Sequence, residues 1–223
     1  MPTTCVVAVD SFGVAVGRRL VARLPDTVLL PRQFDRPIPA GYLPLADAYV
    51  LVAARQVEDL CQWLDDSVHV WRRKLLPVVV EHPWLRVGPL VAPGSGACAT
   101  CYLRRFRQHH RSLPQWEALV THYRVHTTDG PRGYLPSTVF LAAELAAQQL
   151  SEAFTGDNSG AGTVRHLHLL GHQMRRSTVI GIHGCPRCGS GRQEPERSYA
   201  RLAEVLQPVI DAQEVDNGVA IGN

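Results

Sequence analysis

Two pairs of cysteines with the same spacing constrain this chain more than any other feature. Cys98 and Cys101 form the first C-x-x-C pair, Cys185 and Cys188 form the second, and 83 residues separate the two pairs. A spacing of two residues lets both sulfurs of a pair face one ion, and two such pairs complete the tetrahedral four-thiolate shell that structural zinc prefers. The pattern therefore predicts one zinc site that clamps the middle of the chain to its C-terminal segment.

The residues around the cysteines agree with this prediction. Pro186 and Gly189 shape the turn of the second pair. Arg187, together with Arg104 or Arg105 beyond the first pair, is expected to soften the negative charge of four thiolates. A metal that closes so long a loop contributes on the order of 10 kcal/mol to the folded state. The alternatives are a redox dithiol formed by one pair, or reduced thiols without metal. A catalytic zinc is disfavoured, because four thiolates leave no open coordination position.

Composition narrows the class of protein. The chain has 223 residues, of which 45% are hydrophobic, and this suits one α/β domain or one domain with a small appendage. A net charge of +3 is too small to favour a nucleic-acid binder. No apolar run approaches the ~20 residues that span a bilayer, and no signal peptide begins the chain, so we expect a cytoplasmic protein without a membrane partner. In that compartment Cys5 and Cys61 are expected to be buried thiols.

The first half of the chain alternates between strand and helix patterns. Helices are expected over Val14–Leu24 and Gln56–Arg73. Apolar, β-rich runs predict five strands: Thr4–Val9, Thr27–Leu30, Ala48–Ala54, Leu75–Val80 and Leu85–Val91. This order is typical of a doubly wound sheet of Rossmann type.

The second half is less regular. A basic stretch, Arg104–Arg111, follows the first cysteine pair, and irregular structure is expected from there to about Pro136. Beyond it we expect two helices and one antiparallel strand pair: helices Ser137–Phe154 and Ser198–Ile210, strands Val164–Leu170 and Ser177–His183. Residues 1–93 thus form a Rossmann-like α/β part, and residues 94–223 a zinc-binding part with helices and a β-hairpin, packed together as one domain.

The turn after the first strand does not predict a nucleotide site. The fingerprint for dinucleotides needs three glycines, but only Gly13 and Gly17 are present, at the wrong spacing. Asp10 would also repel a phosphate at the N-terminus of the following helix. We therefore predict no ATP or NAD at this turn. Arg18 and Arg19 are candidates for a phosphate contact, but a solvated helix face explains them equally well.

No other residues form a recognisable catalytic set. No serine lies in a G-x-S-x-G elbow, convincing acid/base pairs are absent, and the ten histidines are scattered. Asp65 and Asp66 are assigned to a solvated helix face. The stretch Arg104–Arg111 is expected to be exposed basic surface, with binding of an acidic peptide or nucleic acid as the alternative.

Several of these pieces together resemble a known family. The run from Asp47 to Arg105 resembles the middle of the ubiquitin-activating-enzyme-like (ThiF/MoeB-type) fold, and in particular the branch that serves in making thiazole/oxazole-modified peptides. In that branch a strand and a helix lead to a "GPLV-P" segment, here Gly88–Pro93, and then to C-x-x-C and arginines. An Ala-rich helix ending in Thr155-Gly156 and an H-x-C-P-x-C-G motif at His183–Gly189 complete a resemblance that spans about Thr4 to Gly189.

The resemblance implies a truncated, Rossmann-like sheet with a four-cysteine zinc-binding segment, and zinc on Cys98, Cys101, Cys185 and Cys188. It also implies a partner protein of a YcaO-type cyclodehydratase in azol(in)e-forming ribosomal peptide biosynthesis. In such systems the YcaO component uses ATP to cyclise Cys, Ser or Thr residues of a precursor peptide. The ubiquitin-activating-like partner presents the precursor and raises that activity. The expected partners are therefore the precursor peptide and the YcaO-type enzyme, in a homodimer or a hetero-complex.

This sequence departs from the adenylating branch of the family. Ala53-Ala54 stands where an Asp is expected after the third strand, and no cysteine lies between Cys101 and Cys185 to form a thioester. The chain is therefore expected not to be an enzyme by itself. Two other functions remain open, namely an ATP-dependent adenylating activator of a carboxyl terminus and a zinc-ribbon nucleic-acid binder. The winged-helix leader-binding module of many relatives does not precede the first strand, so leader recognition is expected in another protein or on a different surface.

Overall fold

The computed structural model describes residues 2–31, 39–155, 160–189, 203 and 206–207. The chain divides into two units, Met1–Gly189 and Ser190–Asn223. The helix expected at Ser198–Ile210 lies almost entirely outside the described residues, and Gly156 of the Thr-Gly motif is also outside them. Everything below concerns the first unit.

The described residues form a mixed α/β fold around a seven-stranded sheet. The strands are β1 (Thr4–Ala8), β2 (Thr27–Pro31), β3 (Ala48–Ala53), β4 (Lys74–Glu81), β5 (Trp84–Val87), β6 (Thr163–His168) and β7 (Met174–Thr178). Their order in the sheet is β2-β1-β3-β4-β5-β6-β7. Strands β2, β1, β3 and β4 are parallel, whereas β5, β6 and β7 each pair antiparallel with the preceding strand in this order.

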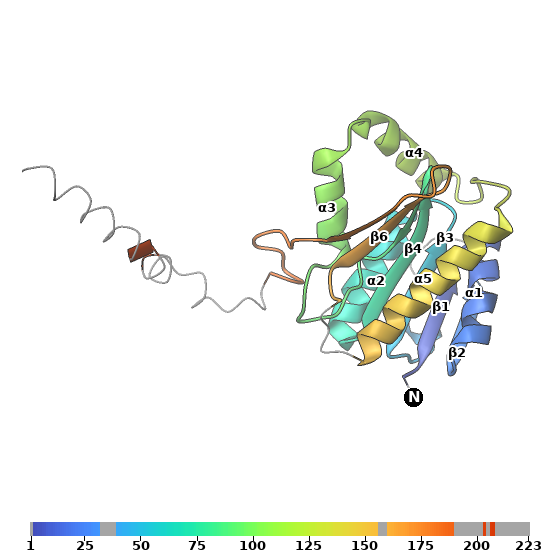
Figure 1. Cartoon of the computed structure of the whole chain (residues 1–223), viewed down its shortest axis with the longest axis horizontal. Coiled ribbons are helices and arrows are strands. Elements are labelled where there is room, and N and C mark those ends of the chain that lie inside the picture. Colours follow the sequence, from blue (N-terminus) through green and yellow to red (C-terminus); the bar gives the residue numbers. More distant parts are fainter. Residues whose placement is uncertain (1, 32–38, 156–159, 190–202, 204–205, 208–223) are drawn as a thin grey trace, which may run out of the picture. The chain divides into compact units, whose positions relative to one another are not determined.

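Helices cover both faces of the parallel strands. The five α-helices of the described part are α1 (Ser11–Arg23), α2 (Glu58–Trp71), α3 (Ala99–His109), α4 (Leu113–Val125) and α5 (Pro136–Thr155), with a short 3-10 turn, η1, at Ala40–Tyr42. One face of the sheet packs against α1 and α5, and the opposite face packs against α2 (Figure 1). Strands β1 and β3 are buried along their whole length, which explains their continuous apolar sequences. None of the described helices has the length and apolar character needed to cross a membrane.

The first helix packs closely on the sheet. A Cβ atom at Gly13 would lie 2.6 Å from the carbonyl oxygen of Val52, so glycine is required for α1 to start where it does. Strand β2 lies on one side of β1 and β3 on the other. Successive strands are therefore added first on one side of β1 and then on the other. A switch point of this kind is where open α/β sheets commonly bind ligands.

The expectation of irregular structure before Pro136 was wrong. Helix α4 occupies much of this region. Only Trp116 and Val120 of α4 are buried, which leaves too short an apolar pattern to reveal a helix. Helix α4 also contacts a distant part of the chain, because Arg124 forms an ion pair with Asp59 of α2 at 2.8 Å.

The last strand also begins earlier than expected. Strand β7 covers Met174–Thr178, and all five of its residues are exposed, so it has no alternation of apolar and polar residues. The apolar residues that suggested a strand further along have a different role. Val179 and Ile182 pack against the buried cysteines. Apolar character after Thr178 therefore marks the surroundings of the cysteine pairs rather than a strand.

Candidate metal centre

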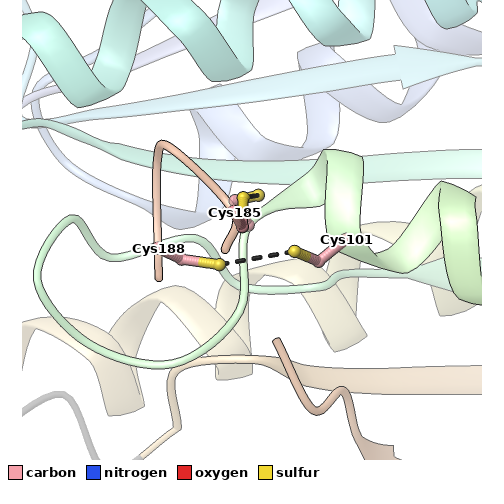
Figure 2. Close-up of side chains that lie close together, drawn as sticks. Cys101, Cys185 and Cys188 are labelled. Atoms are coloured by element: carbon pink, nitrogen blue, oxygen red, sulfur yellow. Dashed lines mark hydrogen bonds between the residues drawn. The ribbon is translucent and has the colours of Figure 1, made fainter. Parts of the chain in front are cut away.

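The two distant cysteine pairs meet at one point. The sulfur atoms of Cys98, Cys101, Cys185 and Cys188 all lie within 4.8 Å of one another. The Sγ atoms of Cys98 and Cys185 are 3.7 Å apart, and those of Cys101 and Cys188 are 3.4 Å apart. Figure 2 shows the Cys101 and Cys188 sulfurs pointing toward each other with Cys185 beside them. All four residues predicted from spacing are thus brought together, with one thiol of each pair facing one of the other pair.

The first pair is positioned by the N-terminus of α3. Cys98 immediately precedes this helix and Cys101 lies in its first turn. The cap of α3 comes from another helix, because the carboxylate of Asp65 on α2 accepts hydrogen bonds from the backbone N–H groups of Ala99 at 3.3 Å and Thr100 at 3.1 Å. The hydroxyl of Thr100 donates to the same carboxylate at 2.9 Å. The start of α3 is therefore fixed to α2.

The second pair lies in a tight turn after β7. The backbone N–H of Ile182 donates to Cys101 Sγ at 3.3 Å, which ties this segment to the first pair. Within the turn the N–H of Gly189 donates to the carbonyl of Cys185 at 2.8 Å. A Cβ atom at position 189 would lie 2.5 Å from that carbonyl oxygen, so the turn requires glycine.

An arginine joins the second pair to α2. Arg187 donates from Nη1 to the hydroxyl of Thr100 at 2.8 Å and forms ion pairs with Asp65, at 3.9 Å, and with Asp66. Its guanidinium therefore adds positive charge beside the sulfurs, as the sequence suggested. Arg105 has a structural contact instead, since its Nε donates to the carbonyl of Ile180 at 3.1 Å.

The environment of the thiols differs from one to the next. Burial raises the pKa of Cys98, and it raises the pKa of Cys188 to about 11. Burial also acts to raise the pKa of Cys185. Hydrogen bonds from the backbone N–H groups of Cys188 and Arg187, together with the thiols of Cys101 and Cys188, more than offset it, so that this pKa falls to about 7. A divalent cation favours the thiolate form of every ligand and releases their protons on binding. Four convergent sulfurs are the donor set that suits zinc or another thiophilic metal.

Asp65 is the functional residue that the sequence analysis placed wrongly. It was assigned to a solvated helix face together with Asp66, but its side chain is 0% exposed, whereas that of Asp66 is 51% exposed. The signal was available in the spacing: Asp65 follows Leu64 and lies four residues after Cys61, on the buried side of α2. A carboxylate on the apolar side of a helix is expected to have a buried partner.

The switch point at β1 holds a carboxylate. Asp10 accepts hydrogen bonds from the N–H of Gly13 at 2.8 Å and from the N–H of Ala54 at 2.6 Å. It lines an open cavity of about 1140 Å³ together with Ser11, Arg55 and residues 127–132. Arg55 donates to the carbonyl of Thr127 at 2.6 Å. One N–H that a phosphate would use at this helix N-terminus, that of Gly13, is therefore engaged by Asp10.

The chain resembles several proteins of known structure. No family model and no curated protein sequence matches the chain. The heterocyclase TruD superposes with a TM-score of 0.60 at 16% identity, over 84% of this chain and 27% of TruD. One chain of the E. coli microcin synthetase McbBCD complex gives 0.60 at 11% identity, over 82% and 67% of the two chains. E. coli MccB solved with MccA gives 0.56 at 13% identity, over 84% and 66%.

The chain shares its fold with these proteins. It spans about a quarter of the length of the heterocyclases that it matches, since a second heterocyclase, solved with substrate and cofactor, is covered over 27% of its length at a TM-score of 0.59. At sequence identities of 11–16%, these comparisons show a shared backbone fold and do not show a shared function.

Proposed function

We propose that this chain is a zinc-binding partner protein of azol(in)e-forming ribosomal peptide biosynthesis, with no catalytic activity of its own. It presents a precursor peptide to a YcaO-type cyclodehydratase, activates that enzyme, or does both. Its fold in this proposal is a truncated Rossmann-like sheet of the ubiquitin-activating-enzyme type. The observation that carries the proposal is the convergence of Cys98, Cys101, Cys185 and Cys188 in a fold shared with a heterocyclase and a microcin synthetase component.

The structural neighbours support a role around a peptide substrate. They include heterocyclases, a synthetase named for three components, and MccB bound to MccA. A protein that works in such an assembly needs a stable surface for its partners. We propose that it acts in the cytoplasm, as a homodimer or in a hetero-complex with the YcaO-type enzyme.

Zinc has a structural role in this proposal. Cys98, Cys101, Cys185 and Cys188 would hold it, and four sulfur ligands leave no position for a substrate. The ion would fix the N-terminus of α3 against the turn after β7, because one pair belongs to each. Its function is then to shape the surface formed by α3 and β7.

The hydrogen bonds of Asp10 at the switch point support the proposed lack of catalytic activity. The carboxylate of Asp10 already accepts from the N–H groups of Gly13 and Ala54. A nucleotide phosphate would have to displace this carboxylate and overcome its charge. The N-terminus of α1 is therefore a poor site for the phosphates that adenylation requires.

A second candidate is an adenylating enzyme of the same fold. The open cavity of about 1140 Å³ at Asp10 and Arg55 favours it. So does E. coli MccB solved with AMPCPP and MccA, which shares the fold at a TM-score of 0.51 and 15% identity, over 77% of this chain and 49% of MccB. Calorimetry with ATP and magnesium separates the two candidates. The first predicts no saturable heat, and tight binding would instead support the enzyme.

Reconstitution tests the first candidate directly. The chain is purified and added to the YcaO-type enzyme and the short precursor encoded beside its gene, and ring formation is measured by mass spectrometry as loss of one water per ring. We expect cyclisation to be at least about tenfold faster with the chain present, because a precursor held beside the enzyme reacts as if it were more concentrated. Cyclisation at the same rate without the chain, or the absence of such neighbouring genes, would contradict the proposal.

A further inference from the structure

A second cavity lies at the carboxyl ends of β3 and β4, away from the cysteines. It measures about 800 Å³ and lies between these strand ends and helices α3 and α4. Figure 1 shows α4 beyond the ends of the strands and α3 beside β6. Ligand pockets commonly measure about 300–1,000 Å³. The cavity is therefore large enough for several residues of a peptide, and none of the four cysteines lines it.

The walls of this cavity are rich in aromatic rings. Trp84 comes from β5, Phe106 from α3, and Trp116 and Tyr123 from α4. The rings of Phe106 and Trp116 lie 5.3 Å apart between centroids. Aromatic faces in a cavity provide contact area for planar or apolar groups.

Two buried hydrogen-bond donors on the wall lack a partner. Gln56 and Trp116 are each 8% exposed. The side-chain Nε2 of Gln56 and the indole Nε1 of Trp116 have no hydrogen-bond partner among the described residues. An unsatisfied donor in a buried place is costly, and both of these residues line the same cavity. A ligand that brings acceptor oxygens would supply the partners that these two groups lack.

The charge of the lining favours an anion. The arginines Arg55, Arg111 and Arg175 line the cavity, and Glu81 is the single carboxylate among its described lining residues. That carboxylate is already compensated, because Glu81 Oε1 accepts from Arg86 Nε at 2.6 Å. A ligand with carboxylate oxygens therefore matches both the charge and the open donors.

The space continues toward the edge of the sheet. A neighbouring cavity of about 570 Å³ shares Phe106, His109, His110, Arg111 and His166 with the first. It extends to Ser177–Ile180, at the end of β7, which is the last strand in the sheet order. Two adjoining cavities along α3 form an elongated groove, and such a groove fits an extended chain better than a compact metabolite.

We propose that this groove binds an acidic peptide segment. A carboxylate of the peptide accepts from Gln56 Nε2 and Trp116 Nε1, and a neighbouring aromatic or apolar side chain lies against Phe106 and Trp84. The inference deepens the proposed function and rests on it for the identity of the peptide as the precursor. The binding chemistry itself depends on the groove alone.

The test uses nitrogen-15-labelled protein and a defined probe. The probe is an N-acetylated hexapeptide of alternating glutamate and tyrosine, and its control replaces every glutamate by glutamine. The indole N–H signals of the four tryptophans are followed by NMR and assigned through Trp→Phe variants. We expect a saturable shift of the Trp116 signal with the glutamate probe, binding about tenfold weaker with the glutamine probe, and little change at Trp63, which lies on α2 outside the groove.

Two variants remove the open donors while keeping their bulk. Gln56→Met and Trp116→Phe are each expected to weaken binding of the glutamate probe about five- to fiftyfold. Matched controls are Gln148→Met, at an exposed site on α5, and Trp63→Phe, and both should bind as the parent does. If Trp116→Phe unfolds, as judged by its melting temperature, Gln56→Met carries the test.

Several results would overturn the inference. They are the absence of a saturable shift up to about 1 mM probe, the weak end of specific binding, equal affinity for the two probes, or unchanged affinity in Gln56→Met. Zinc content and stimulation of cyclisation are measured on the same preparation. If these persist without probe binding, the groove alone is wrong, whereas probe binding without stimulation contradicts the proposed function instead.

Discussion

The carboxylate of Asp65 accepts a hydrogen bond from the backbone N–H of Thr100, 3.1 Å away, across two helices. Helix α3 begins at Ala99 without a side-chain hydrogen bond from its own N-cap, Cys98. The first N–H groups of a helix need acceptors, and a negative charge there is favoured by the helix dipole. Asp65 therefore supplies from α2 the cap that α3 lacks, and in doing so it places Cys98 and Cys101.

Replacing this carboxylate should weaken both the fold and the metal site. In Asp65→Asn we expect the free energy of unfolding to fall by about 2–3 kcal/mol, because a buried charge-assisted cap is lost. Metal affinity should fall about tenfold, as is usual when a group that positions ligands is removed. Urea denaturation and competition with a zinc indicator measure the two effects. Asp66→Asn is the control, and an equal loss in that variant would contradict the role given to Asp65.

Removing one ligand should remove the metal. Cys188→Ala is expected to be purified with less than about a tenth of the zinc of the parent protein, because three thiolates without a fourth ligand bind zinc far more weakly. Treatment of the parent with a chelator should lower its stability by several kcal/mol, with about 10 kcal/mol as the upper range for a structural zinc. Elemental analysis and thermal melting provide the measurements.

Cys5→Ala is the matched control for this experiment. Cys5 is fully buried in β1, where burial raises the pKa of its thiol to about 11, and it is not part of the cysteine cluster. This variant should keep one zinc per chain. Loss of zinc from Cys5→Ala, or full zinc in Cys188→Ala, would show that the metal is bound elsewhere.

A buried ion pair supports the hairpin that joins the parallel and antiparallel halves of the sheet. Arg86 is 2% exposed, donates to Glu81 at 2.6 Å and lies over the ring of Tyr102 at 4.6 Å. Arg86→Met leaves the Glu81 carboxylate without its cation, and we expect about 3–5 kcal/mol of destabilisation. The double variant Arg86→Met with Glu81→Gln should recover part of this loss in urea denaturation. A double variant less stable than Arg86→Met would contradict the pairing.

His166 should make the protein less stable in mild acid. Burial lowers the pKa of His166 below its usual 6.5, with Glu81 opposing this effect and Arg86 and Arg175 adding to it. The unfolded chain therefore takes up a proton as the pH falls through 6.5, while the folded chain does not, so stability is full above 6.5 and declines below it. One such group changes the free energy of unfolding by at most about 1.4 kcal/mol per pH unit.

The measurement compares urea midpoints at about pH 7.5 and about pH 5.5, on either side of the ordinary histidine pKa. His166→Gln should show a smaller difference between the two values than the parent does, whereas the exposed-site variant His109→Gln should match the parent. Any acid-induced loss of metal affects all three proteins alike and cancels in the comparison. An unchanged difference in His166→Gln would rule out this histidine as the source.

The sequence was most informative where one local pattern decides the structure. The apolar run Ala48–Ala53 predicted a strand buried on both faces, and β3 is such a strand. The two C-x-x-C pairs named four residues whose sulfurs meet within 4.8 Å. The strand residues are close in sequence, and so are the two cysteines within each pair, although 83 residues separate the pairs. In both cases the residue types have few other uses.

Features that depend on distant contacts escaped the sequence. Helix α4 buries only Trp116 and Val120, and an ion pair between Arg124 and Asp59 joins it to α2. The groove beside α3 combines Gln56, which precedes α2, with Trp116 of α4, and neither residue belongs to a motif. Only the fold brings such residues together, so no spacing rule applied to one sequence can find them.

The position of the cysteines couples the last strand of the sheet to the ion. One cysteine pair lies at the start of α3 and the other follows β7, so with an ion bound the chain from Cys98 to Cys188 is a closed circuit that contains α3, α4, α5, β6 and β7. Separation of β7 from the edge of the sheet would strain this closed loop of chain at the metal. Amide hydrogen exchange in β7 should therefore report whether the ion is present, although no residue of that strand touches it.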